Sequence, residues 1–348
     1  MADPAAIHAQ NITKRFGGVA AVDAASVVVP RGHIVALLGP SGAGKTSLLR
    51  TIAGFEEPDE GIVTIGGRVV VAADTWVEPD RRRVGMVFQD GALFPHLTVE
   101  ANVGFSRPRR GRVIECLELV GLAHRSGAYP HELSGGERQR VALARALATD
   151  PEVVLMDEPF ASLDTALRAS LRNEVVQILR ETGASALFVT HDQHEALSVA
   201  DTIVLMRDGR VEQAGEPEQV YAAPRSRWAA EFLGAVDVVP GRASDGIVTC
   251  QFGTFHSPGI GDGDIDVLVR PEAVAIGPAD AVGHYGRPAA PATVVGRSFF
   301  GADQLVHVRL CDGTRISSRR PGYVHWDAGD AVAVWVEGPL TALAAERR

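Results

Sequence analysis

The spacing of apolar and polar positions changes near residue 235. From Ile7 to about Gly234, short apolar strands alternate with segments whose apolar residues recur every three to four positions. Strands that alternate with helices are typical of an α/β domain with a mainly parallel sheet. We therefore predict such a domain over residues 1–235.

Residues 236–348 follow a different pattern. Short runs rich in β-branched residues are separated by glycine, proline and Asp-Gly turns, which is typical of all-β structure. The clearest runs are Val267-Leu268-Val269, Thr293-Val294-Val295, Leu305-Val306-His307-Val308 and Val332-Ala333-Val334-Trp335-Val336. They predict a small β-barrel or sandwich as a second domain over residues 236–348.

Composition limits the functions that fit this chain. The length of 348 residues suits two domains, and 34 Lys and Arg against 43 Asp and Glu give a net charge of −9, which disfavours nucleic-acid binding. The longest apolar runs, such as residues 34–38, are far shorter than the ~20 residues that cross a bilayer. Residues 1–5 do not resemble a signal peptide, and the three cysteines are widely spaced. We expect a protein of the reducing cytoplasm that does not itself span a membrane.

A phosphate-binding motif follows the apolar strand of residues 33–38. Residues 39–46 read G-P-S-G-A-G-K-T, which is the motif G-x-x-x-x-G-K-[ST], and a helical pattern begins directly after it. In such a loop, backbone N–H groups and the helix dipole hold the phosphates, the lysine reaches the β and γ phosphates, and the Thr hydroxyl binds Mg²⁺. The predicted ATP-binding residues here are Gly39, Pro40, Ser41, Gly42, Ala43, Gly44, Lys45, Thr46 and Ser47, with Thr46 also a metal ligand.

Two carboxylates follow the apolar strand of residues 153–156. Ligands of α/β sheets bind at the carboxyl ends of the strands, where Asp157 and Glu158 are expected to lie. We interpret Asp157 as a Mg²⁺ ligand and Glu158 as the general base that polarises the attacking water. The alternative is an acidic strand end that simply faces solvent.

The segment Leu133-Ser134-Gly135-Gly136-Glu137 precedes a helical pattern. Ser134 and Glu137 form an S-x-x-E capping box, which by itself needs no function. However, each glycine in the first turn weakens a helix by about 1 kcal/mol. This cost favours a close approach of an anion to the backbone at that helix N-terminus.

These residues together resemble the ATPases of ABC transporters, because residues 133–137 look like the family signature. The resemblance implies a P-loop ABC ATPase domain with a helical subdomain, Phe16 stacked on adenine, and Gln89 in the loop that senses Mg²⁺ and the permease. It further implies that Ser134, Gly135 and Gly136 contact the γ-phosphate, that the loop containing Asp164 crosses to a partner, and that His191 is the catalytic switch on the γ-phosphate.

Several of these residues have simpler explanations. Phe16 could pack at a strand end, since the family more often has Tyr there. His191, His194 and Glu195 could form a metal cluster, although no HExxH pattern is present. The arginine runs of residues 81–83 and 107–110 are interpreted as solvated faces.

The resemblance also implies the partners and the location of the protein. In this family, ATP is clamped between two subunits, so one chain has only half-sites. We expect a homodimer on the cytoplasmic face of the membrane, bound to two permease subunits and served by an extracytoplasmic solute-binding protein. The second domain resembles the OB-like regulatory (TOBE) barrel of importers.

Substrate assignment rests on residues 269–272 and 298–301, which resemble the ferric-iron and polyamine branches most, and we expect ferric iron. Polyamine, phosphonate or another small solute remain as alternatives. Two other classes are alternatives: a soluble ABC ATPase acting on nucleic acid, and a P-loop small-molecule kinase. The first usually has two cassettes or a long coiled coil, and the second leaves residues 133–137 unexplained.

Overall fold

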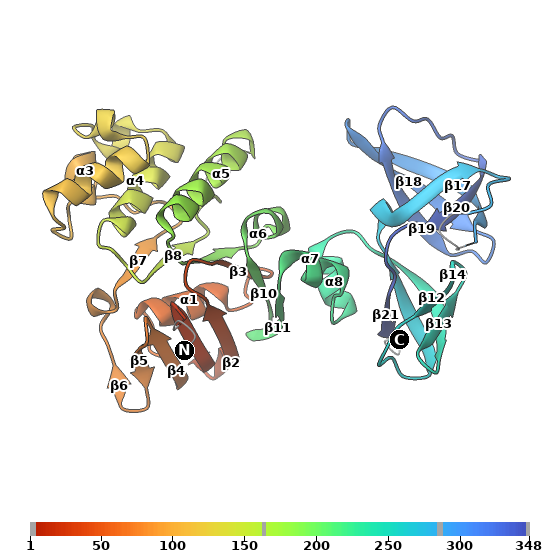
Figure 1. The fold of residues 1–348 in the computed structure, drawn as a ribbon, viewed down its shortest axis with the longest axis horizontal. Helices are drawn as coiled ribbons and strands as arrows, with labels where there is room; N and C mark the ends of the chain where they lie inside the picture. Colours follow the sequence, from red (N-terminus) through yellow and green to blue (C-terminus); the bar gives the residue numbers. More distant parts are fainter. Residues whose placement is uncertain (1–4, 162–164, 284–287, 346–348) are drawn as a thin grey trace. The chain divides into compact units, whose positions relative to one another are not determined.

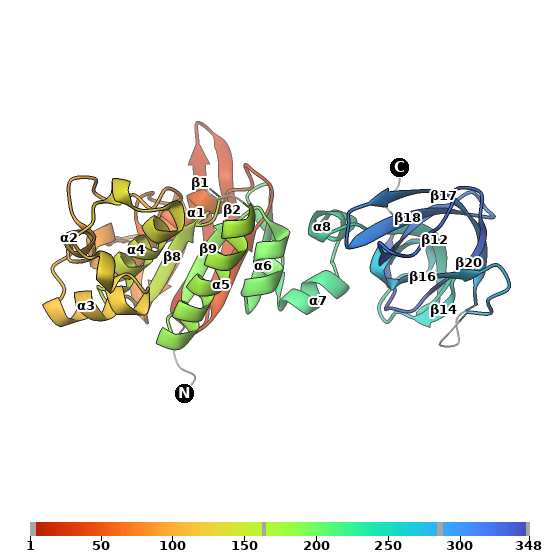
Figure 2. The same cartoon turned by 90° about the horizontal axis from the view of Figure 1, so that it is seen from above.

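The computed structural model describes residues 5–161, 165–283 and 288–345. The chain folds into two compact units, Met1–Val220 and Tyr221–Arg348 (Figures 1 and 2). None of the helices in the described residues is long and apolar enough to cross a membrane. The α/β unit followed by an all-β unit confirms the fold class that the sequence predicts. The boundary at residue 235 stays a prediction.

A largely parallel sheet forms the centre of the first unit. Its strand order is β11-β10-β3-β9-β8-β7, and β11 is the antiparallel edge strand. Every residue of β3, β8 and β9 is buried, as expected for parallel strands covered on both faces. The strands are β3 (Ile34–Leu38), β7 (Val84–Val87), β8 (Val153–Asp157), β9 (Ala186–Thr190), β10 (Thr202–Arg207) and β11 (Arg210–Gly215).

An antiparallel sheet of order β2-β1-β4-β5-β6 lies beside it, and helix α1 (Lys45–Ala53) packs against strands of both sheets. Leu48, Leu49 and Ile52 of this helix are fully buried in the shared core. This packing explains why the apolar pattern after residue 46 predicts a helix. The strands are β1 (Ile7–Phe16), β2 (Val19–Val29), β4 (Glu60–Ile65), β5 (Arg68–Ala72) and β6 (Thr75–Trp76).

The remaining helices of the first unit carry the signature segment and cover the parallel sheet. Helices α2, α3 and α4 contact one another and form the helical subdomain (yellow to orange in Figure 1). Short 3-10 turns span Pro79–Arg81, Ala123–Arg125 and Pro130–Glu132. The helices are α2 (Val99–Val103), α3 (Arg110–Leu119), α4 (Gly135–Leu147), α5 (Thr165–Thr182), α6 (Gln193–Val199) and α7 (Pro217–Ala222), which ends beyond the unit boundary.

The second unit contains two antiparallel sheets around one apolar core. Their orders are β14-β13-β12-β15-β21 and β16-β20-β17-β18-β19, and helix α8 (Arg227–Leu233) precedes them. All four predicted β-rich runs lie in these strands. The strands are β12 (Asp237–Ser244), β13 (Ile247–Cys250), β14 (Gly253–His256), β15 (Gly263–Val269), β16 (Val274–Pro278), β17 (Ala290–Phe299), β18 (Asp303–Leu310), β19 (Arg315–Pro321), β20 (Ala331–Val336) and β21 (Thr341–Ala344), with a 3-10 turn at Pro271–Ala273.

Arg270 fixes α8 to the strands within this unit. Its Nη1 donates to the carbonyls of Ala230, Gly234 and Ala235 at 2.9, 3.0 and 3.1 Å. Its guanidinium also lies 4.1 Å from the ring centroid of Tyr221. Residues 221–235 therefore belong to the packing of the second unit.

The interpretation of residues 81–83 as a solvated face is wrong for Arg82. Its side chain is 2 % exposed, and its Nη1 donates to the carbonyls of Thr51 and Ile52 at 2.8 and 2.9 Å. Its Nε donates to the Val77 carbonyl at 2.7 Å, and its guanidinium stacks on Trp76. The Thr51 and Ile52 carbonyls lie in the last turn of α1, where carbonyls have few partners within the helix, so the buried charge adds donors to them. Arg81 and Arg83 are exposed as predicted.

Candidate functional site

The phosphate loop leads from the carboxyl end of β3 into α1, as the sequence predicts. Lys45, the first residue of α1, is buried, and its Nζ donates to the carbonyls of Gly39 and Pro40 at 2.8 and 2.9 Å. The loop therefore wraps around the lysine ammonium. Burial lowers the pKa of Lys45, while the carboxylates of Glu158 and Asp157 act in the opposite direction.

Gly44 shows why the second glycine of the motif is needed. Its φ of 91° lies in the left-handed region, where side chains are strained. A Cβ at this position would also collide with the Ala21 carbonyl oxygen of β2. The close contact between the loop and β2 therefore requires glycine at residue 44.

Asp157 lies beside the first turn of α1. The Thr46 hydroxyl donates to Asp157 Oδ1 at 3.1 Å, so these two predicted metal ligands lie next to each other. Burial raises the pKa of Asp157, and the hydrogen bond from Thr46 opposes this effect. A hydroxyl and a carboxylate are the hard oxygen donors that Mg²⁺ prefers. The pair therefore fits a Mg²⁺ ion that also contacts a phosphate.

Glu158 and His191 follow neighbouring parallel strands, β8 and β9. His191 Nδ1 lies 3.3 Å from Glu158 Oε2, and their side chains are 54 % and 24 % exposed. Glu158 has a φ of 44°, an uncommon conformation for a residue with a side chain. Strained residues of this kind cluster at functional sites, where surrounding structure holds them in place. The carboxylate and the imidazole therefore lie together at the carboxyl end of the sheet, with the imidazole the more exposed of the two.

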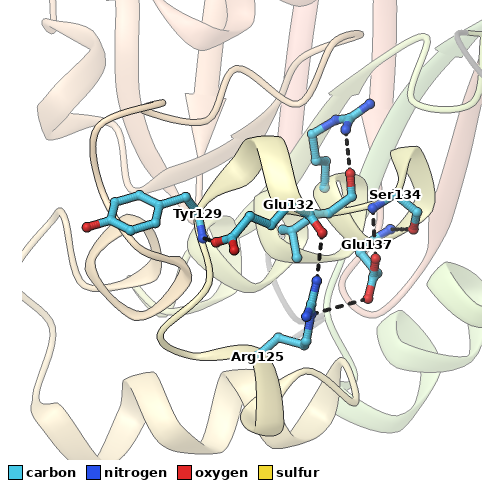
Figure 3. Close-up of polar contacts among 7 residues, drawn as sticks. Arg125, Tyr129, Glu132, Ser134 and Glu137 are labelled. Atoms are coloured by element: carbon cyan, nitrogen blue, oxygen red, sulfur yellow. Dashed lines mark hydrogen bonds and ion pairs between the residues drawn. The ribbon is translucent and has the colours of Figure 1, made fainter.

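The signature segment begins α4 (Figure 3). Ser134 is the N-cap: its Oγ accepts from Glu137 N at 3.3 Å, and its own N–H donates to Glu137 Oε2 at 2.8 Å. These bonds lower the pKa of Glu137, as does the nearby Arg125 guanidinium. The predicted capping box is therefore present. Gly135 and Gly136 form the start of the first turn, so no side chains of these two residues cover the helix N-terminus.

Arg125 joins the segment before the signature to the capping box. Its Nη2 donates to the Glu132 carbonyl at 2.6 Å, and its Nε lies 3.8 Å from Glu137 Oε1 (Figure 3). Glu132 in turn accepts from Tyr129 N at 2.6 Å. The loop that presents Ser134 is thus held by charged hydrogen bonds on both sides.

Side chains of α4 bind main-chain carbonyls of the Gln89 segment. Gln139 Nε2 donates to the Gln89 carbonyl at 2.9 Å. Arg145 donates to the carbonyls of Ala92 and Gly91 at 2.8 and 3.1 Å. Sequence reasoning missed both α4 residues, because an arginine or glutamine on a helix gives no signal of a partner some 50 residues away.

Two predicted site residues, Phe16 and Asp164, are not part of the contacts described above. Phe16 ends β1 with its side chain 50 % exposed, and Lys14 Nζ lies 5.3 Å from its ring centroid. An exposed ring is available for stacking, but its contact with adenine stays a prediction. Asp164 lies outside the described residues.

The alternative metal cluster at residues 191–195 gains no support from the geometry. Glu195 accepts a hydrogen bond from Thr190 Oγ1 at 2.6 Å, and His191 faces Glu158. In the part of the chain that the structure describes, no three His, Cys, Asp or Glu side chains are grouped to hold a metal ion.

The phosphate loop, with carboxylates opposite it at the carboxyl edge of a parallel sheet, defines a P-loop nucleotide-binding protein. Family comparison specifies the class further. The model of the ABC transporter family matches residues 22–161, and the model of the TOBE domain matches residues 267–339. The chain belongs to the ABC transporter ATP-binding proteins, of the import type that carries a C-terminal TOBE domain.

Import ATP-binding proteins resemble the chain along three quarters or more of its length. It is 43 % identical to "Fe(3+) ions import ATP-binding protein FbpC 1" of Rhodococcus jostii, covering 97 % of this chain and 98 % of that protein. It is 42 % identical to FbpC of Pseudomonas fluorescens, covering 92 % and 97 %. It is also 45 % identical to "Sulfate/thiosulfate import ATP-binding protein CysA" of Mycolicibacterium paratuberculosis, over 76 % and 77 %.

Solved structures resemble about three fifths of the chain. The ATP-binding cassette MJ0796, in a dimeric post-hydrolysis state with ADP and Pi, is 31 % identical with a TM-score of 0.52, covering 61 % of this chain and 98 % of that one. CbiO1 of Clostridium perfringens, part of an ABC transporter complex, is 28 % identical with a TM-score of 0.58, over 63 % and 91 %.

Proposed function

We propose that this chain is the ATP-hydrolysing subunit of an ABC importer that takes up ferric iron. It acts as a homodimer on the cytoplasmic face of the membrane, where it drives a separate permease. The observation that carries this proposal is the grouping of Lys45, Thr46, Asp157, Glu158 and His191 at one edge of the parallel sheet.

ATP is the substrate of the proposed reaction. Lys45 binds the β and γ phosphates, with the loop amides and the dipole of α1 adding positive potential. Glu158 accepts a proton from the attacking water, and His191 fixes the position of that carboxylate relative to the γ-phosphate. The 3.3 Å contact between their side chains supports this pairing.

Thr46 and Asp157 would hold Mg²⁺, with the side chain of Gln89 as a further ligand. The ion would supply charge neutralisation to the β and γ phosphates. The buried carboxylate of Asp157 gains from a cation, because burial in the free chain disfavours its charged form.

The signature completes the site in a second copy of the chain. Ser134, Gly135 and Gly136 lie at the N-terminus of α4, which is a ready anion site. In the dimer they bind the γ-phosphate of the ATP that Lys45 of the other copy holds, and the loop containing Asp164 crosses to the same partner. The dimeric state of the similar cassette MJ0796 supports this arrangement.

Ferric iron is favoured as cargo because the FbpC relatives of Rhodococcus jostii and Pseudomonas fluorescens match this chain along 97 % and 92 % of its length. The similar sulfate/thiosulfate protein covers only 76 % of the chain. Because that relative carries a different cargo in its name, ferric iron is a proposal for this chain. The cargo itself contacts the permease and the solute-binding protein, so this chain specifies it only through its partners.

The motor role is tested by phosphate release from the purified full-length chain with Mg-ATP. We expect steady turnover that Lys45→Ala abolishes, and ATP-dependent dimers that Ser134→Arg prevents. The matched control is Arg81→Ala, which removes an exposed positive charge outside the phosphate loop. Turnover in Lys45→Ala equal to that of the unmodified chain would rule out the assigned site.

The cargo is tested by uptake in cells that lack this gene. Labelled ferric iron, spermidine and sulfate are compared under iron limitation, with complementation by the unmodified gene or by Lys45→Ala. Loss of iron uptake that only the unmodified gene restores supports the proposal. Normal iron uptake together with lost sulfate or spermidine uptake would overturn the cargo while leaving the motor assignment intact.

A further inference from the structure

The turn that carries His191 is held by two side chains with no role in the proposed reaction. His191 lies between Thr190, the last residue of β9, and Asp192, the N-cap of α6. Glu195 lies in the first turn of α6 and reaches back to Thr190. The residues on both sides of the histidine are therefore fixed.

A continuous hydrogen-bond chain makes this connection. The Asp192 N–H donates to Thr190 Oγ1 at 3.0 Å, and the Thr190 hydroxyl donates in turn to Glu195 Oε2 at 2.6 Å. Asp192 Oδ1 accepts from His194 N and Glu195 N at 2.7 and 3.3 Å. The two bonds of Thr190 span the backbone of His191, and the two bonds of Asp192 fix the first turn of α6, so the backbone of the histidine is held on both sides.

Burial distinguishes the supporting residues from the histidine. Thr190 and Glu195 are 2 % and 5 % exposed, whereas the side chain of His191 is 54 % exposed. Burial raises the pKa of Glu195, and Asp192 acts in the same direction. The Thr190 hydroxyl and the guanidinium groups of Arg168 and Arg172 on α5 act in the opposite direction. Burying a carboxyl group costs free energy, whereas burying an apolar side chain does not. The hydrogen bond from Thr190 accounts for the presence of a carboxyl group at this buried position.

We propose that Thr190 and Glu195 are positioning residues that set where the His191 imidazole lies relative to Glu158. They act through the backbone of residues 190–192. This inference rests on the proposed role of His191. Because a small displacement of a reacting group can cost a large factor in rate, weakening this support lowers turnover without weakening ATP binding.

Two matched pairs of variants test the inference in the full-length chain. Thr190→Val keeps the shape of the side chain but removes the hydroxyl, whereas Thr190→Ser keeps the hydroxyl. Glu195→Ala removes the acceptor, whereas Glu195→Gln keeps an oxygen that can accept from Thr190. The readouts are kcat for phosphate release, the Kd of a non-hydrolysable ATP analogue, and the ¹⁵N resonances of the His191 imidazole.

We expect kcat to fall about tenfold in Thr190→Val and Glu195→Ala, with shifted His191 resonances and an unchanged Kd. Thr190→Ser and Glu195→Gln should stay within about twofold of the unmodified chain on all three measures. Thermal unfolding of each variant separates loss of fold from loss of position, and the Glu195 pair gives the decision if Thr190→Val does not fold.

Full turnover with unshifted resonances in Thr190→Val and Glu195→Ala would overturn the inference, as would a Thr190→Ser chain as slow as Thr190→Val. His191→Ala is measured alongside as a reference. If His191→Ala itself keeps full turnover, the proposed function of His191 fails, and the imidazole resonances alone decide whether Thr190 and Glu195 position it.

Discussion

His191 Nδ1 lies 3.3 Å from Glu158 Oε2, although 32 residues separate them in the sequence. Each residue directly follows the last residue of a buried strand, and the two strands are parallel neighbours. Parallel pairing therefore brings their side chains together at one edge of the sheet. The acid–base chemistry that we propose for the site depends on the strand order, since neither segment contains the pair by itself.

The first prediction concerns Glu158→Gln. The amide cannot accept the proton of the attacking water, while Asp157 and Thr46 are unchanged, so ATP should still bind. We expect phosphate release to fall at least about 100-fold, and the variant to accumulate as an ATP-bound dimer in size-exclusion chromatography. The exposed Glu57→Gln is the control and should behave like the unmodified chain. Unreduced turnover would remove Glu158 from the role of general base.

The second prediction compares two glycines of the phosphate loop. Gly42 and Gly44 both have positive φ, 83° and 91°, but only a Cβ at Gly44 would meet the Ala21 carbonyl. Without nucleotide, Gly42→Ala should lower the free energy of unfolding by about 1 kcal/mol, from backbone strain alone. Gly44→Ala should lower it by at least about 2 kcal/mol more. Urea denaturation measures both, and equal losses would show that the loop can move away from β2 at little cost.

The third prediction concerns the buried Arg82. Replacing it with Met keeps much of its volume but leaves the carbonyls of Thr51, Ile52 and Val77 without their donor. We expect Arg82→Met to lower the free energy of unfolding by about 3 kcal/mol, and the exposed Arg81→Met to change it by less than about 0.5 kcal/mol. A similar small change in both variants would contradict the role assigned to Arg82.

The fourth prediction tests the domain boundary. A chain of residues 221–348 retains α8 and Tyr221, whereas a chain of residues 236–348 leaves Arg270 without its three carbonyl acceptors. We expect both to fold, with the shorter chain less stable by about 2 kcal/mol in urea. Equal stability would support the boundary at residue 235 that the sequence predicts.

Local motifs explain what sequence alone could predict. The phosphate loop, the strand before Asp157 and the capping box of Ser134 each lie within about ten consecutive residues, so their pattern is visible without the fold. The environments of Arg82 and Glu195 were not predicted. A run of three arginines usually faces solvent, and the burial of Arg82 depends on carbonyls about 30 residues earlier in the chain.

The hydrogen bond between Thr190 and Glu195 could not be predicted from the sequence either, but for a different reason. Both lie within six residues of each other, yet a threonine at a strand end and a glutamate in a first turn are each common, and neither indicates the hydrogen bond between them. Only the direction in which α6 leaves β9 makes the two side chains meet.

The contacts of α4 with the Gln89 segment join two parts of the chain that are far apart in the sequence. Gln139 and Arg145 bind main-chain carbonyls at residues 89, 91 and 92, and those bonds do not depend on the side chain of Gln89. Substitution of the Gln89 side chain alone therefore leaves the segment bound to the helix that begins with the signature.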